Sequence, residues 1–376
     1  MVMVKETLRL TIVVTYISVG VVVIQMVHMD HLANYLKDMQ PKKPNERMTW
    51  LNHKMKRLKR KKWEQPCYSF PYLCIVSEDE KYMQRCIDLA NLGQGKVAPN
   101  PLVGCVIVKD GYIIGEGYHE TYGGAHAEIN AIKNVGDEGK IEGSTFYVSL
   151  EPCTHFGKTP PCALELIRLK PKRVVIGSRD TNPSVAGRGV ERLNRAGIEV
   201  SEGILSDACR ALNKRFFTFH EKRRPYVILK WAQTQDGFLD RNREEDDLGI
   251  HWISSPETKV LVHKWRSEEQ GILVGRNTIL NDNPSLTVRE YSGNNPIRIV
   301  IDSNLKLSSD VGVFSDEAPT IVFNRIKNAI EGKTEWVKIP ETSTKFILDE
   351  LYKRNIISIL VEGGSRTLQY FIIDNV

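Results

Sequence analysis

The sequence is poor in cysteine: it has seven in 376 residues, and they do not form the dense paired pattern of a disulfide scaffold. It also lacks the composition of collagen-like and of wholly disordered chains, because 41% of its residues are hydrophobic and glycine and proline are moderate. We find no convincing internal repeat. These absences predict a globular chain of two or three domains in a reducing compartment, where cysteines serve metal binding or packing.

Excess charge is confined to one segment. The formal net charge is +6, yet "KMKRLKRKKWE" (54–64) alone carries seven Lys or Arg residues against one Glu. Such a run is more typical of a juxtamembrane or solvated segment than of a nucleic-acid site. The remainder of the chain is close to neutral, so the overall charge says little about it.

Charged residues are absent from "LTIVVTYISVGVVVIQMV" (10–27), which is about the length that crosses a hydrocarbon core. As a transmembrane segment it would leave the rest of the chain in the cytosol, because the Lys/Arg excess follows it. Its β-branched residues would equally suit a buried strand pair, although amphipathic alternation is missing. A third interpretation is that residues 1–76 arise from an over-extended start.

Beyond residue 76, helical and strand patterns alternate. "EDEKYMQRCIDLANLG" (78–93) has apolar residues at helical spacing and ends at glycine, and Asp110-Gly111 joins two strands in a predicted hairpin. A charged linker with a proline at 221–225 precedes a second series of apolar strands and helices. We therefore predict an N-terminal extension (1–76) and two α/β domains, over 77–222 and 223–376.

Two cysteines, Cys153 and Cys162, each follow a proline in "LEPCTHFGKTPPC" (150–162). Two thiolates close in space repel each other, so a divalent cation is the natural reason to place them together, and zinc prefers sulfur and imidazole ligands. His126, which opens the predicted helix of "HAEINA", is the third expected ligand, and a position is left for water. Glu128 would then carry protons between that water and a substrate amine. His155 is a rival ligand, but a substrate-facing or surface role suits it better.

The order H-x-E, then P-C and a second cysteine, is the signature of zinc deaminases, whose usual spacing is Cys-x-x-Cys. "VAPNPLVGCVIV", "HAEINAI", "YVSLEPCTHFGKTPPC" and "NPSVAGRGVERLNRAGIEV" resemble the bifunctional deaminase–reductase family of riboflavin biosynthesis. The resemblance implies a cytidine-deaminase-like three-layer domain that uses Zn2+ and removes the 2-amino group of a phosphoribosylated diaminopyrimidinone by hydrolysis. Asn100, in "APNP", is a candidate substrate contact or a turn-forming residue.

The second half is similar to the family's reductase domain in "LKWAQTQDGFLDR", "GILVGRNTILNDNPSLTVR" and "ILVEGGSRTLQ". This similarity implies a dihydrofolate-reductase-like α/β fold and NADPH-dependent reduction of the ribosyl side chain to ribityl. The positions expected to line the cofactor are Ala232, Trp252, Thr278, Asp282, Ser303 and Gly364. Those expected on the substrate side are Arg266, Leu286, Arg289 and Glu362.

Elementary chemistry agrees with several of these positions. The guanidinium groups of Arg266 and Arg289 can each donate two hydrogen bonds to a phosphate. Gly364 precedes a predicted helix, whose first backbone N–H groups can also bind a phosphate. No histidine or carboxylate of this half stands out as an acid–base group, so hydride transfer would rely on positioning. "GRGVER" (187–192) begins like a dinucleotide fingerprint but lacks its third glycine, and we interpret it as the entry to a helix.

Two features depart from the family pattern. Ile250 stands where the family often has serine, so a hydroxyl contact is absent there. The family also continues for several tens of residues beyond the position of Val376, so we expect a truncated reductase domain.

The resulting prediction is a zinc- and NADPH-dependent enzyme of the cytosol. It would act on a small phosphoribosylated pyrimidine and not on nucleic acid, and would assemble with copies of itself. Three alternatives stay open: a deaminase with an incomplete reductase module, a nucleic-acid-acting deaminase tethered by the basic run, and a membrane-tethered scaffold without catalysis.

Overall fold

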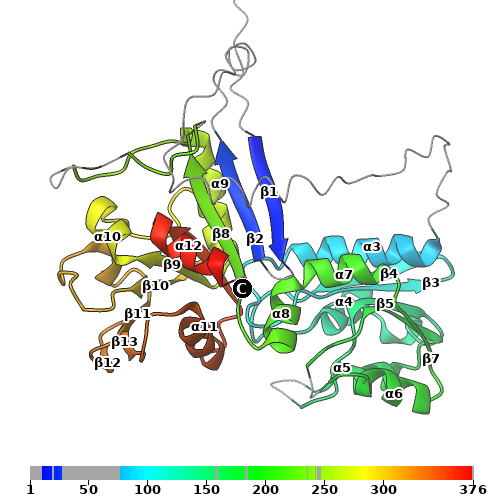
Figure 1. Cartoon of the computed structure of the whole chain (residues 1–376). Helices are drawn as coiled ribbons and strands as arrows, with labels where there is room; N and C mark the ends of the chain where they lie inside the picture. The colour runs from blue at the N-terminus through cyan, green and yellow to red at the C-terminus, as the bar shows by residue number, and fades with distance from the viewer. Residues whose placement is uncertain are drawn as a thin grey trace, which may run out of the picture. The chain divides into compact units, whose positions relative to one another are not determined.

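The computed structural model describes residues 11–18, 21–27, 77–156, 160–182, 185–234, 236–241, 243 and 247–374, and the structural statements below concern these residues. Their strands form two sheets, one of five strands and one of nine (Figure 1). The five-stranded sheet lies within the first predicted α/β domain. The basic segment 54–64 falls outside the described residues.

The first sheet has the strand order β4-β3-β5-β6-β7. Its strands are β3 (Gly104–Lys109), β4 (Tyr112–Tyr118), β5 (Thr145–Leu150), β6 (Arg173–Ser178) and β7 (Glu199–Glu202). β3 pairs antiparallel with β4 and β5, whereas β5, β6 and β7 run parallel. Asp110 and Gly111 have φ angles of 52° and 79°, the left-handed values that a two-residue hairpin turn requires. The predicted hairpin is therefore confirmed.

Helices cover both faces of this sheet. They are α3 (Glu78–Asn91), α4 (Ala127–Val135), the 3-10 helix η1 (Glu138–Lys140), α5 (Cys162–Leu169), α6 (Arg188–Arg195), α7 (Ser206–Leu212) and α8 (Lys214–Lys222). Met83 of α3 and Cys209 of α7 pack in one core cluster, while α4, α5 and α6 contribute to another, which contains Leu166 and Leu193. Figure 1 shows α3 and α7 on one side of the strands and α5 and α6 on the other. This is the predicted three-layer arrangement.

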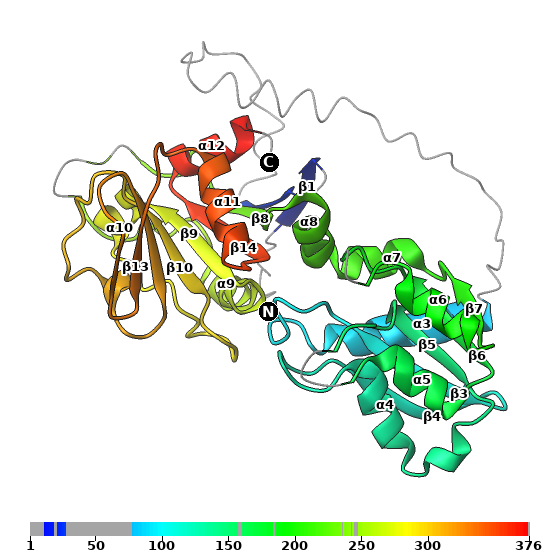
Figure 2. The same ribbon diagram turned by 90° about the horizontal axis from the view of Figure 1, so that it is seen from below.

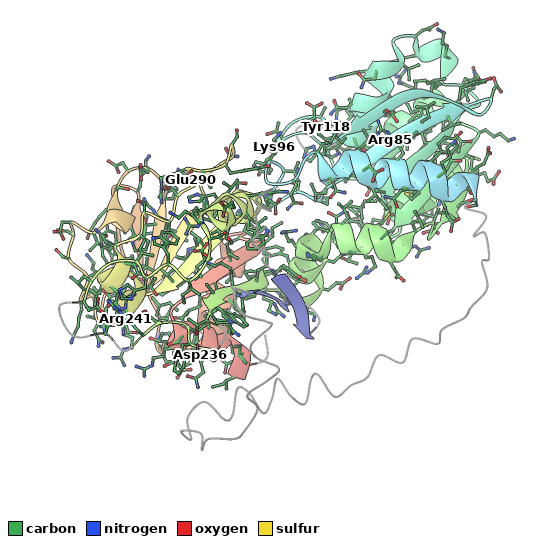
Figure 3. The ribbon with its side chains drawn as sticks, turned by 90° about the horizontal axis from the view of Figure 1, so that it is seen from above. Arg85, Lys96, Tyr118, Asp236, Arg241 and Glu290 are labelled. Atoms are coloured by element: carbon green, nitrogen blue, oxygen red, sulfur yellow. The ribbon has the colours of Figure 1, made fainter. Side chains whose placement is uncertain are left out.

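Packing, more than surface charge, holds these layers together. Figure 3 labels Arg85, which projects from α3. Its guanidinium pairs with Glu116 of β4, with Nε 2.7 Å from Oε1. The Arg85 side chain is 47% exposed, so water screens the pair and it stabilises the fold little. Met83, by contrast, is fully buried beneath the same helix.

The second sheet has the order β1-β2-β8-β14-β9-β10-β11-β13-β12. The strands of its C-terminal part are β8 (Tyr226–Gln233), β9 (Gly271–Gly275), β10 (Ile297–Ile301), β11 (Thr320–Asn324), β12 (Ala329–Glu331), β13 (Thr334–Lys338) and β14 (Ser358–Gly363). β8, β14, β9, β10, β11 and β13 are parallel to their neighbours in this series. Figure 2 shows β13, β10, β9 and β14 along this sheet.

Both faces of the second sheet are covered. The helices are α9 (Pro256–Glu268), α10 (Arg276–Asp282), the 3-10 helix η2 (Gly312–Phe314), α11 (Thr344–Lys353) and α12 (Ser365–Ile373). Successive β9 residues point to opposite faces: Leu273 packs in one core cluster, and Ile272 and Val274 pack in another. A parallel sheet with covered faces accounts for the continuous apolar strands of the sequence.

Residues 11–18 and 21–27 of the apolar segment form strands in this second sheet. β1 (Thr11–Ser18) and β2 (Val21–Val27) pair antiparallel, and β2 runs parallel to β8 in register from Val21↔Val227 to Val27↔Gln233. This differs from the transmembrane interpretation, because both segments are extended strands and β2 pairs with β8 of the reductase-like half. Among the helices of the described residues, none has the length and apolarity to cross a bilayer.

Candidate active sites

Three predicted metal ligands converge at one end of the first sheet. His126 is the N-cap of α4, Cys153 lies in the loop after β5, and Cys162 is the first residue of α5. Their donor atoms all lie within 4.8 Å of one another. The sequence therefore folds so that two helix starts and one strand end bring an imidazole and two sulfurs together.

The spacing of these donors suits a tetrahedral zinc ion. His126 Nδ1 lies 3.5 Å from Cys153 Sγ and 3.3 Å from Cys162 Sγ. Tetrahedral bonds of about 2.0–2.1 Å to nitrogen and about 2.3 Å to sulfur would place such donors about 3.6 Å apart. Three protein ligands leave one position for water, which is the arrangement of catalytic zinc sites. His155 is exposed and is not part of this cluster.

The local environment lowers the pKa of one thiol and raises the pKa of the neighbouring carboxyl. Hydrogen bonding from Cys162, and then from His126, lowers the pKa of the Cys153 thiol to about 4. Glu128 is only 4% exposed, and this burial raises the pKa of its carboxyl, an effect that the charge of Cys153 reinforces. A carboxyl with a raised pKa beside a metal site is suited to accept and return a proton near neutral pH.

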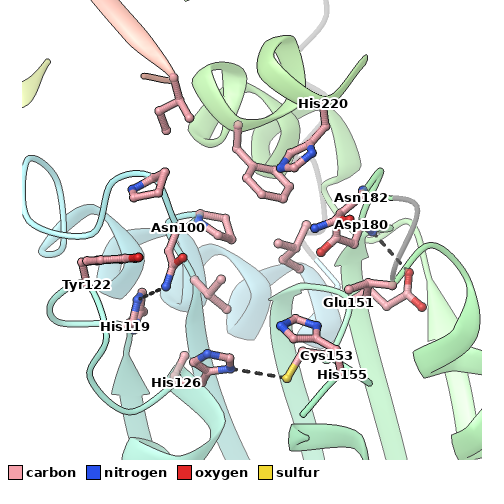
Figure 4. A pocket seen from close by; sticks show the side chains of 18 of the residues that line it. Asn100, His119, Tyr122, His126, Glu151, Cys153, His155, Asp180, Asn182 and His220 are labelled. Atoms are coloured by element: carbon pink, nitrogen blue, oxygen red, sulfur yellow. Dashed lines mark hydrogen bonds between the residues drawn. The ribbon is translucent and has the colours of Figure 1, made fainter. Parts of the chain in front are cut away.

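A cavity of about 420 Å³ opens beside these residues (Figure 4). Its lining includes His126, Glu128 and Cys153, and the predicted substrate contact Asn100. This volume is in the range of small-molecule sites. The structure thus places Glu128 and two of the three predicted metal ligands, His126 and Cys153, in the wall of one pocket.

Asn100 and His119 form a hydrogen-bonded pair in this pocket. His119 Nδ1 lies 2.9 Å from the carbonyl oxygen of Ala125, so it must donate there. The neutral ring then accepts at Nε2, which lies 3.1 Å from Asn100 Nδ2. Burial lowers the pKa of His119, which favours this neutral form. Asn100 Oδ1 is therefore the amide atom left for a ligand. The backbone N–H of Asn100 also closes a turn to the carbonyl of Val97, so both interpretations of this residue have support.

Sequence reasoning missed several pocket residues. His119, Asp180 and Asn182 line the cavity (Figure 4), and burial raises the pKa of Asp180 to about 6. Glu151, next to the Pro-Cys pair, also lines it. Lone polar residues outside the metal motif give no pattern that marks them, and only the sheet topology brings them to one place.

The six predicted cofactor positions line a second cavity of about 790 Å³. They are Ala232, Trp252, Thr278, Asp282, Ser303 and Gly364. Gly364 is the N-cap of α12, as the glycine pattern predicted. Ile250, the departure from the family pattern, lines the same cavity and is 46% exposed.

The four predicted substrate positions divide between two environments. Glu362 lines the cavity, whereas Arg266, Leu286 and Arg289 are not among the described residues that line it. Arg266 donates through Nε and Nη2 to Glu362, at 2.8 Å each, and through Nη1 to the Thr287 carbonyl. Leu286 is 2% exposed and packs in the core. A phosphate would have to compete with Glu362 for Arg266, so the predicted role of Arg266 stays a prediction.

Two cations hold Glu362 as a carboxylate. Its burial would raise its pKa, but the charges of Arg266 and Lys230 lower the pKa to about 2. Lys230 Nζ lies 3.5 Å from Glu362 Oε2, and Lys230 lines the second cavity. Lys230, Arg276 and Arg325 are cavity cations that the sequence did not single out.

Two family models match the chain. The cytidine and deoxycytidylate deaminase zinc-binding region matches residues 76–178, and the RibD C-terminal domain matches residues 225–376. Riboflavin biosynthesis protein RibD of Aquifex aeolicus is 43% identical over 78% of this chain and 83% of its own length. The RibD of Escherichia coli is 39% identical over 76% of this chain and 82% of its own length.

Solved structures agree with these matches. A diaminohydroxyphosphoribosylaminopyrimidine deaminase/5-amino-6-(5-phosphoribosylamino)uracil reductase from Thermotoga maritima is 43% identical, with a TM-score of 0.73 over 79% of this chain and 84% of that one. RibD of Acinetobacter baumannii is 33% identical, with a TM-score of 0.72 over 79% and 83%.

Proposed function

Because this chain belongs to the RibD family of riboflavin biosynthesis, we propose that His126, Cys153 and Cys162 hold the zinc of its deaminase half and that Glu128 moves the proton. The enzyme is bifunctional: it carries a deaminase domain that uses Zn2+ and a reductase domain that uses NADPH. The observation that carries the residue assignment is the convergence of one imidazole and two sulfurs beside a buried carboxyl in a pocket.

The chain's own residues supply the proton transfer. When bound, zinc lowers the pKa of water to about 7, which makes water a nucleophile at neutral pH. Glu128 takes the proton that the water gives up and returns it to the departing ammonia, a task for which its raised pKa suits it.

The substrate that we propose is the phosphoribosylated diaminopyrimidine on which the Thermotoga protein's name says it acts. Asn100 presents Oδ1 to the pocket as an acceptor for an N–H of the pyrimidine, with His119 fixing the amide orientation. Asp180 and Asn182 add further polar groups to the pocket wall.

For the reductase half, we place NADPH in the cavity lined by the six predicted positions. NADPH supplies the hydride when it is bound. The start of α12 at Gly364 offers backbone amides to one phosphate of NADPH. Arg276 and Arg325 also line the cavity and can bind the remaining phosphates. Lys230, held next to Glu362, offers a charged donor to the substrate.

Two separate assays of the purified full chain test this function. We expect ammonia release from the diaminopyrimidine and NADPH oxidation with the deaminated product, together with one bound zinc. Ammonia release without NADPH oxidation would support the alternative of a deaminase with an inactive reductase module. Self-association and a cytosolic location stay predictions, which sedimentation of the purified chain and cell fractionation would test.

A further inference from the structure

We propose that Glu151 is a positioning residue of the deaminase, whose buried carboxylate fixes the segment that carries Asp180 and Asn182 into the pocket. This inference rests on the proposed deaminase function. Glu151 directly follows β5 and is 4% exposed, and its backbone N–H bonds to the carbonyl of Ser178 on the neighbouring strand. Figure 4 shows Glu151 on the same side of the pocket as Asp180 and Asn182.

The Glu151 carboxylate accepts four backbone N–H groups from one segment. Oε2 accepts from Asp180 at 3.2 Å and from Gly187 at 3.0 Å. Oε1 accepts from Gly189 at 2.9 Å and from Val190 at 3.3 Å. One side chain thus ties the end of β6 to the start of α6.

The hydrogen-bond partners of the Glu151 carboxylate are backbone amides. In the part of the chain that the structure describes, no Lys or Arg forms an ion pair with it. The four N–H groups, two of them in the first turn of α6, favour a negative charge at a helix N-terminus. A buried carboxylate with these four hydrogen bonds holds the donating backbone in place, because without it the four N–H groups would lack a partner.

The two glycines of "GRGVER" make this contact possible. Gly187 has a φ of 75°, in the left-handed region that favours glycine. A Cβ on Gly189 would lie 2.4 Å from the Pro152 carbonyl oxygen and 3.1 Å from Glu151 Oε1. Like a dinucleotide fingerprint, this glycine-rich turn binds an anionic group. Here that group is the carboxylate of Glu151 in the same chain.

The held segment forms part of the substrate pocket. Asp180, Asn182 and Val185 line the cavity, and Asp180 Oδ1 accepts the N–H of Asn182 at 2.7 Å. None of the three is a metal donor. Releasing Glu151 would move the pocket wall while leaving the zinc donors in place, so substrate binding should suffer more than turnover.

Glu151→Gln tests the proposal in the full chain. Each carboxylate oxygen accepts two N–H groups, so the amide nitrogen of glutamine would face two donors wherever it points. Gly189→Ala keeps the carboxylate but pushes the start of α6 away from it. Glu202→Gln is the matched control, because Glu202 pairs with Arg179 on the surface of the same sheet.

The readouts are KM and kcat for ammonia release, bound zinc, and NADPH oxidation by the same molecules. We expect both Glu151→Gln and Gly189→Ala to raise KM by roughly tenfold or more and to change kcat by less than about threefold. Zinc content and NADPH oxidation should match those of the wild type and of Glu202→Gln.

An unchanged KM in Gly189→Ala and Glu151→Gln would overturn the proposal. So would a kcat that falls in step with lost zinc at constant KM, because Glu151 would then support only the metal loop. If Glu151→Gln fails to fold, as loss of secondary structure in circular dichroism would reveal, Gly189→Ala decides by the same criterion. A wild-type chain that releases no ammonia would instead contradict the proposed function.

Discussion

Among single residues, Glu128 carries the sharpest prediction. Glu128→Gln keeps the shape of the side chain but removes the exchangeable proton, so we expect a full complement of zinc and a fall in ammonia release of about 10²-fold to 10⁴-fold. Cys162→Ser, which removes a donor, should lose both zinc and ammonia release. Ammonia release and metal content are measured on the same preparations. Full turnover in Glu128→Gln would show that another group moves the proton.

The metal site could be predicted from sequence, whereas most of the pocket could not. His126 and Glu128 lie on one helix start and the cysteines each follow a proline, so a local pattern contains the chemistry. His119 enters the pocket from the loop after β4, whereas Asp180 and Asn182 enter it from the loop after β6, so only the sheet topology brings them together. Glu151 lay beside the motif, but its partners are backbone amides, which leave no mark on side-chain composition.

Among the elements, the β1–β2 hairpin is one that the sequence left open between a transmembrane segment, a strand pair and an over-extended start. An uncharged run of this length suits a membrane helix, and the absence of alternation argued against strands. Alternation is expected only when one face of a sheet meets water, so its absence alone does not exclude strands. The pairing partner, β8, lies about 200 residues further on, where no local pattern points back to it.

Removing residues 1–28 should damage the reductase half selectively. β2 pairs with β8 along its whole length, and Met26 lies opposite Ala232, a residue of the cofactor cavity. Without the hairpin, β8 becomes an unpaired edge. We expect the midpoint temperature of thermal unfolding to fall by roughly 5 °C or more. The rate of NADPH oxidation should drop, while ammonia release persists.

A chain that lacks only residues 1–9 is the control, because it keeps both strands of the hairpin. It should match the full chain in both activities. If the longer deletion leaves NADPH oxidation and thermal unfolding unchanged, the hairpin is dispensable to the sheet.

For the molecule as a whole, Glu362 should make stability depend on pH. Its folded pKa of about 2 lies below the ordinary value of 4.5, so its contribution is fully present above pH 4.5 and is lost as pH falls toward 2. Glu362→Gln should lower the free energy of unfolding at pH 7 by roughly 3 kcal/mol, because Arg266 and Lys230 lose their partner. Urea unfolding followed by circular dichroism measures this difference.

The difference between wild type and Glu362→Gln should shrink as pH falls from 4.5 toward 2. Asp349→Asn, a change at an exposed carboxylate of the same domain, is the control and should change the free energy of unfolding little. A gap between wild type and Glu362→Gln that stays constant with pH would mean that Glu362 is not the titrating group.

X-ray absorption at the zinc edge of the purified chain tests the central claim most directly. The donor set predicts two sulfur neighbours at about 2.3 Å and one imidazole nitrogen at about 2.0–2.1 Å, with water in the remaining position. Cys153→Ser should remove one sulfur from that shell. A zinc shell without sulfur, or a chain active as a deaminase without zinc, would contradict the account.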